Sequence, residues 1–161
     1  MLETEAALNA FLVQYCRMLV ADIPEERMVE QPLPDVNHPA WILGHLAWST
    51  DRVLQVLGAE PALPAEWATR FGVGSKPAPA RDAYPSKEEL MRTLESGFER
   101  ARRLATEATP EQLAQPSTNP RFKDALPTAQ HVTALLLTGH MGIHLGQLTM
   151  WRRMMGTAPL F

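Results

Sequence analysis

Apolar side chains recur every three or four residues in four separate stretches of this 161-residue chain, which is the pattern of amphipathic helices. Almost nowhere do apolar and polar positions alternate as they do in a β-strand. The first stretch covers residues 4–21. The spacing predicts one helix there, whose apolar stripe faces a core and consists of Leu8, Leu12, Tyr15 and Leu19.

The second stretch predicts a helix over residues 39–58, since it begins with a proline, which suits a first helical turn, and Asn37 or His38 can cap it. The residues that follow, 59–85, are rich in proline, alanine and glycine and predict a long connection. We expect one helical turn inside this connection, near Glu66 to Phe71.

The last two stretches predict two more helices. Ser86 followed by Glu89 forms a capping box, so the third helix begins there. A second proline-rich connection, over residues 109–127, leads to Thr128, the expected cap of a fourth helix that ends near Gly156. The sequence therefore predicts an all-α protein, a four-helix bundle with two long crossover connections, formed by the whole chain as one domain.

The candidate chemistry lies in the segment GHMGIHLGQL, where His140 and His144 stand four residues apart in a run without charged side chains. Residues at i and i+4 share one face of a helix, and this is how a helix offers two nitrogens to a metal ion. His45 lies in a second charge-poor segment, HPAWILGHLAW, and is expected to supply a third nitrogen from a neighbouring helix. Three neutral ligands leave coordination positions open and favour the anionic form of a bound water or thiol.

Three more side chains are candidates for the surroundings of this site: Gln147, Trp41 and Trp48. Gln147 is expected either to hydrogen-bond a ligand imidazole or a metal-bound water, or to satisfy a buried backbone group. For the two tryptophans we favour core packing over a role as a substrate box, because aromatic residues dominate bundle cores. No carboxylate lies on the histidine faces, so the sequence identifies no general base and the catalytic residues stay unknown.

Composition narrows the classes of function. The chain has 15 Lys and Arg against 18 Asp and Glu and no basic stripe, so we expect no nucleic-acid partner. Its one cysteine, Cys16, excludes an intramolecular disulfide; with an acidic N-terminus unlike a secretory signal, this predicts a cytoplasmic protein. The run from Ala125 to Trp151 has no charged residue, but its histidines, glutamines and threonines are too polar for lipid, so no membrane association is expected.

The glycines of the fourth helix, Gly139, Gly142 and Gly146, are expected to permit close helix packing. The Cys16 thiol is expected to be a buried apolar group of the first helix, because nothing around it would lower its pKa. A catalytic thiol is therefore not expected.

The segments WILGHL and HMGIHLGQLTMWRRMMG together resemble the DinB/YfiT-like family of metalloenzymes, the DinB superfamily. The resemblance implies a four-helix bundle with two parallel crossovers, usually a homodimer, and a divalent metal held by three histidines, here His45, His140 and His144. Family members with an assigned activity use low-molecular-weight thiols, as in bacillithiol-dependent S-transferases and mycothiol-dependent isomerases. This sequence differs in placing Met141 after the first histidine of the pair, where a carboxylate often follows.

The leading hypothesis is a metal-dependent S-transferase for a low-molecular-weight thiol, or a related detoxification enzyme, with a small-molecule thiol and an electrophile as partners. Zinc or nickel is the expected ion, and manganese and iron also accept imidazole. Two alternatives stay open: a metal-dependent hydrolase that needs no thiol, and a noncatalytic helical module in which metal binding serves stability, sensing or partner binding. If the histidines are only core residues, the protein should hold no stoichiometric metal.

Overall fold

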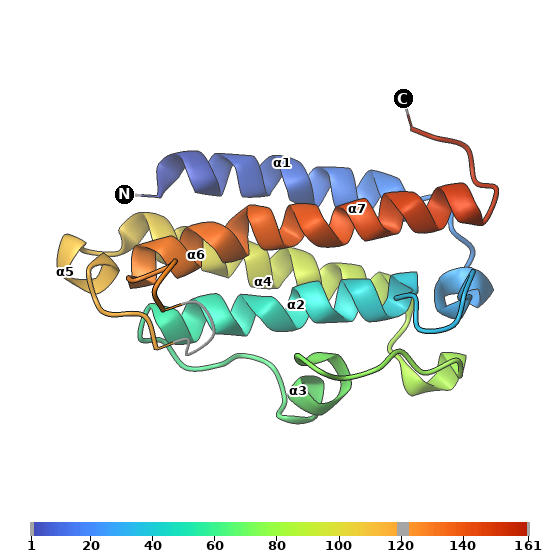
Figure 1. Cartoon of the computed structure of the whole chain (residues 1–161), viewed down its shortest axis with the longest axis horizontal. Coiled ribbons are helices and arrows are strands. Elements are labelled where there is room, and N and C mark those ends of the chain that lie inside the picture. The colour runs from blue at the N-terminus through green and yellow to red at the C-terminus, as the bar shows by residue number, and fades with distance from the viewer. Residues whose placement is uncertain (1, 119–122, 161) are drawn as a thin grey trace.

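The computed structural model of this chain describes residues 2–118 and 123–160, and within them it is helical without a β-strand, so the all-α prediction is confirmed. No helix in these two stretches is both long and apolar enough to cross a membrane. The long helices lie side by side, and α2 is buried along most of its length (Figure 1). They are α1 (Glu3–Val20), α2 (Pro39–Val56), α4 (Lys87–Glu107) and a C-terminal pair, α6 (Ala129–Leu137) and α7 (Gly139–Met154).

Short helices occupy the connections. The 3-10 helix η1 (Glu25–Val29) precedes α2, and the connection after α2 carries α3 (Glu66–Phe71) and η2 (Arg81–Ala83). The helical turn predicted near Glu66 to Phe71 is confirmed. The second connection holds α5 (Pro110–Leu113), which we did not predict, although Thr109 and Gln112 form a full capping box at its start.

The two long connections differ in what they join. The first returns along the bundle and links α2 to α4, which run in the same direction (Figure 1). The second links α4 to α6 at one end of the bundle, and these helices run in opposite directions, so it is not a crossover of the predicted kind. Inside it Ser117 donates its backbone N–H to the carbonyl of Pro127 at 2.9 Å, which draws the two ends of the loop together.

The predicted N-caps of α2 and α4 are confirmed. His38 accepts the backbone N–H of Trp41 on Nδ1 at 3.1 Å, and Ser86 accepts that of Glu89 on Oγ at 3.1 Å. The other nitrogen of His38 donates to the carbonyl of Ala78 at 2.9 Å. One buried histidine therefore caps α2 and also fixes the long connection to it.

The fourth helix is not continuous, which corrects the prediction of one helix from Thr128 to Gly156. It breaks at Thr138, whose backbone angles of φ −122° and ψ −76° are not helical, and resumes as α7 at Gly139, one residue before the first histidine of the pair. The break frees the carbonyl of Leu137, and buried Asn9 donates to it from Nδ2 at 2.7 Å. Asn9 in turn accepts from Arg102 on Oδ1 at 2.9 Å, so α1 and α4 both hold the break in place.

The buried face of α1 is rotated away from the predicted apolar stripe. Leu19 is buried as predicted, but Leu8 is 51% exposed and Phe11 beside it 64% exposed. Asn9 and Cys16 take interior positions instead. Burial and the nearby Glu95 carboxylate raise the pKa of the Cys16 thiol to about 12, which supports the expectation of an inert, buried cysteine.

Candidate metal centre

Three histidines from two helices converge in the bundle. His45 comes from α2, and His140 and His144 come from successive turns of α7. One ring nitrogen of each lies within 4.8 Å of the other two, and the Nε2 atoms of His45 and His140 are 3.1 Å apart. Two nitrogens bound to one tetrahedral zinc ion at about 2.0–2.1 Å stand roughly 3.3 Å apart, so the spacing of the His45–His140 pair fits a single ion.

Hydrogen bonds to oxygen acceptors set the tautomers of two of these rings. Nδ1 of His45 donates to the carbonyl of Phe71 at 2.6 Å, and Nδ1 of His144 donates to Oε1 of Gln147 at 3.1 Å. The same Oε1 accepts from Nδ2 of Asn37 at 3.1 Å. Because each neutral ring carries its hydrogen on Nδ1, Nε2 keeps a lone pair for a metal ion, as in most histidine sites.

Burial keeps the three imidazoles neutral. It lowers the pKa of His140 to about 3, with further lowering from the nearby His144 and His45 rings. Burial and the His45 ring lower the pKa of His144 to about 4, against the opposite effect of its bond to Gln147. Burial lowers the pKa of His45 as well. A metal ion therefore meets unprotonated ligands at neutral pH.

One nitrogen of His140 has no partner. Its Nδ1 atom is buried and makes no hydrogen bond to any described residue. An orphaned buried nitrogen is rare in proteins and costs free energy when a ring is merely part of a core. This Nδ1 atom is the ring nitrogen turned away from His45, so a metal ion on Nε2 would not satisfy it, and the orphaned atom gives no support to the ligand set.

The two tryptophan candidates lie on either side of His45. The Trp41 ring is parallel to the His45 imidazole, with centroids 4.7 Å apart and an interplanar angle of 10°, and its Nε1 donates to Oγ of Ser75 at 3.0 Å. Trp41 is buried, as core packing predicts. Trp48 is less buried than Trp41. Its ring centroid is 5.6 Å from that of His45, and its side chain forms part of a cavity wall.

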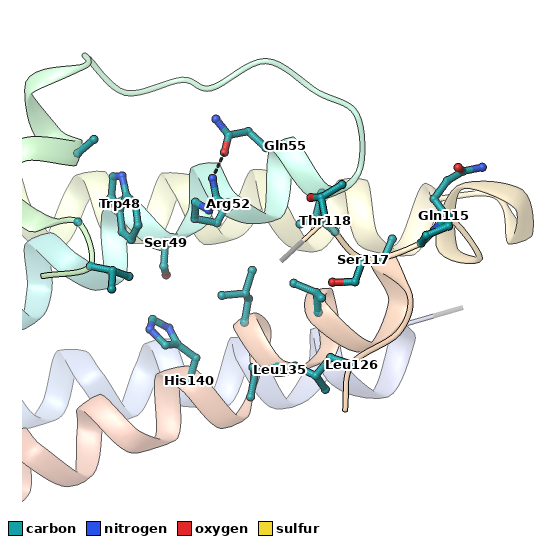
Figure 2. A pocket seen from close by; sticks show the side chains of 18 residues that line it. Trp48, Ser49, Arg52, Gln55, Gln115, Ser117, Thr118, Leu126, Leu135 and His140 are labelled. Atoms are coloured by element: carbon teal, nitrogen blue, oxygen red, sulfur yellow. Dashed lines mark hydrogen bonds between the residues drawn. The ribbon is translucent and has the colours of Figure 1, made fainter. Parts of the chain in front are cut away.

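A cavity of about 720 Å³ opens beside the histidines, and the His140 side chain points into it (Figure 2). One wall is a face of α2, and the opposite wall is formed by α6 and by the loop around Ser117. None of the described lining residues is a carboxylate, which agrees with the absence of a general base in the sequence patterns. The α2 wall consists of Trp48, Ser49, Arg52, Gln55 and Val56.

Sequence reasoning missed two parts of this site. The acceptor of His45 is a backbone carbonyl, that of Phe71, and a main-chain oxygen leaves no trace in residue identity. Asn37 was considered only as a helix cap, whereas its side chain holds Gln147. Of the two roles left open for Gln147, the structure shows the bond to a histidine ring.

The chain belongs to the DinB superfamily, because the model of that family matches residues 13–148. This span contains all three histidines and every described residue that lines the cavity. A comparison with curated proteins finds no match. Family membership and the three-histidine cluster together fit a metal-binding protein.

Proposed function

We propose that this protein is an enzyme that joins a low-molecular-weight thiol to an electrophile, with a divalent ion, zinc or nickel, held by His45, His140 and His144. The observation that carries the proposal is three neutral imidazoles meeting beside a 720 Å³ cavity. Structural zinc sites are usually closed by four protein ligands, whereas catalytic sites use three and keep a position for substrate. Among the described residues the cluster contains three ligands.

A divalent ion with three neutral ligands favours the anionic form of a thiol at neutral pH. The chain's own residues orient the ligands: Phe71 and Gln147 hold hydrogens on the outer ring nitrogens, and the Trp41 ring stacked on His45 restricts its rotation. In the net reaction the sulfur forms a bond to the electrophilic carbon. The leaving group departs with the electron pair of the broken bond, and the thiol proton passes to solvent.

The metal is tested by elemental analysis of untagged protein. We expect about one divalent ion per chain in the wild type and its loss in His140→Ala. His131→Ala is the matched control, since His131 is exposed on α6, bonded to Thr128, and outside the cluster. Absence of metal in the wild type after reconstitution with several ions would reduce the three histidines to core residues.

The reaction is tested by mixing metal-loaded protein with a cellular thiol and a chromogenic aryl chloride. We expect chloride release and a thioether product that require both thiol and metal. Turnover of an ester without thiol would indicate a hydrolase instead. The noncatalytic module would be indicated if the protein held a full complement of metal but showed no turnover. In that case the main effect of removing the metal should be a lower melting temperature.

We also propose that the protein acts in the cytoplasm as a homodimer. An apolar surface on α1 and α7 supports a second copy: Phe11, Ile143 and Met150 are all more than half exposed. A shallow groove of about 320 Å³ lies between these helices, bordered by Gly142 and Gly146. Among the described residues, nothing beyond each glycine's own helix backbone lies within 4 Å of where a Cβ would stand, so the close packing predicted for Gly142 and Gly146 is not seen, whereas a Cβ on Gly139 would lie 3.1 Å from Leu135.

A further inference from the structure

We propose that the cavity selects a substrate with an apolar body and a carboxylate that pairs with Arg52, which lies across the cavity from His140 (Figure 2). The inference rests on the proposed function and names the chemical class of molecule that this site accepts. Arg52 and His140 line the same cavity, so one substrate molecule can place its carboxylate at Arg52 and its opposite end at His140.

The first argument is position along α2. His45, Ser49 and Arg52 are spaced by four and three residues and therefore share one face of the helix. At a rise of 1.5 Å per residue, Arg52 stands about 10 Å along the helix from His45. The Ser49 hydroxyl between them donates to the carbonyl of Leu46 at 2.7 Å, so its proton is already committed within the helix.

The second argument is charge. Arg52 is the one charged side chain among the described residues that line the cavity. Its side chain is exposed, and no described carboxylate forms an ion pair with it. A positive charge that the protein leaves without a counter-ion at a cavity wall favours an anion there.

The third argument is that Arg52 is held but not saturated. One of its terminal nitrogens donates to Oε1 of Gln55 at 2.6 Å, and both residues line the cavity (Figure 2). A guanidinium has five N–H groups, so donors remain for the two oxygens of a carboxylate. Gln55 reduces the freedom that the side chain would lose on binding.

The fourth argument is the wall opposite Arg52. It is formed by apolar side chains of α6, Val132, Leu135 and Leu136. A hydrocarbon body fits between this wall and α2, whereas a highly charged molecule would lose hydration without compensation. The combination selects one anionic group on an otherwise apolar or weakly polar ligand.

The test begins with metal-free protein, so that it does not depend on the proposed chemistry. Octanoate is titrated by calorimetry into wild type, Arg52→Gln and Arg92→Gln. We expect Arg52→Gln to weaken binding about tenfold, the loss of one charge-assisted hydrogen bond. Arg92→Gln removes an exposed charge on α4 outside the cavity and should leave affinity unchanged. Octanol, which lacks the charge, should bind the wild type and Arg52→Gln with equal affinity.

The second arm uses cobalt-loaded protein and follows the thiolate-to-cobalt absorption band. We expect ω-mercaptooctanoate to bind more tightly than mercaptopropionate, which is too short to reach Arg52. Arg52→Gln should reduce that preference about tenfold, since the apolar wall still favours the longer chain. Equal octanoate affinity in wild type and Arg52→Gln, or no octanoate binding, would overturn the carboxylate site even if the absorption band appears. Arg52-dependent octanoate binding without a thiolate band for any thiol would instead reject the proposed thiol chemistry and keep the carboxylate site.

Discussion

The backbone carbonyl of Phe71 accepts a hydrogen bond of 2.6 Å from Nδ1 of His45. Phe71 is the last residue of α3, in the middle of the long connection, and its ring packs directly over Gly44. A Cβ added to Gly44 would overlap that ring. The glycine before His45 therefore leaves room for the residue that orients the histidine.

Gly44→Ala should destabilise the protein, although alanine is the better helix former by about 1 kcal/mol. The added methyl displaces the Phe71 ring, and we expect a loss of roughly 1–3 kcal/mol in the free energy of unfolding, together with weaker metal binding. Urea denaturation and a metal titration measure the two effects. The matched control is Gly142→Ala, which has open space around its Cβ and should stabilise the protein slightly. Because Gly142 borders the groove proposed for a second copy, both glycine variants are compared in the monomeric Phe11→Glu background, where equal stability would contradict the packing argument.

Gln147→Leu should weaken metal binding about 10–100-fold, because it removes the acceptor that holds the hydrogen of His144 on Nδ1. Gln147→Glu keeps an acceptor oxygen and should retain most of the affinity. Competition with a chromogenic chelator measures both constants. If the leucine variant bound metal as tightly as the wild type, the orientation of His144 would depend on other contacts.

The stability of the metal-free protein should fall as the pH drops below 6.5. In the unfolded chain His140 has its ordinary pKa of 6.5, but in the folded protein burial lowers its pKa to about 3. The unfolded state therefore binds the proton first, and stability from this residue, fully present above pH 6.5, is lost as the pH falls toward 3. The slope approaches about 1.4 kcal/mol per pH unit for one such histidine.

Denaturation curves between neutral and mildly acidic pH measure this slope. It should be smaller in His140→Ala, which lacks the buried ring, and unchanged in His131→Ala, whose ring is exposed. Identical slopes in all three proteins would show that His140 is protonated in the folded state as readily as in the unfolded one.

Asn9→Ala should cost about 1–3 kcal/mol, since it removes the donor to the Leu137 carbonyl and leaves Arg102 without its acceptor. Because the break between α6 and α7 precedes His140, metal affinity should fall too. Gln14→Ala, an exposed substitution on the same helix, is the control and should change neither value by more than about 0.5 kcal/mol. A destabilised Asn9 variant with unaltered metal affinity would show that the helix break at Thr138 does not position the histidine cluster.

Phe11→Glu should convert the proposed dimer to a monomer by placing a charge on the apolar surface of α1 and α7. Sedimentation velocity at several concentrations measures the mass. Leu33→Glu changes a leucine away from these helices that is also more than half exposed, and it should leave the dimer intact. A wild-type monomer at all concentrations would reject the proposal before any variant is made.

Local rules within the sequence were sufficient for much of this protein. The helix caps at His38 and Ser86 depend only on neighbouring residues, and so does the turn at Glu66–Phe71. The i, i+4 spacing of the histidine pair sets both rings on one face of α7 whatever the rest of the chain does. The charge-poor surroundings of His45 then identified the third member of the cluster.

Tertiary contacts decided the rest. The break at Thr138 depends on Asn9, which is more than a hundred residues away in sequence, and the buried face of α1 rotates to bring that side chain inward. The tautomer of His45 depends on a main-chain oxygen, and the cavity with its Arg52 forms only where α2 and α6 face each other. The sequence by itself determined where the main helices lie and which side chains could ligate a metal ion, because those properties are local. Only the packed structure decided which faces meet and which groups orient the histidines, because backbone acceptors and distant partners have no signature in local sequence.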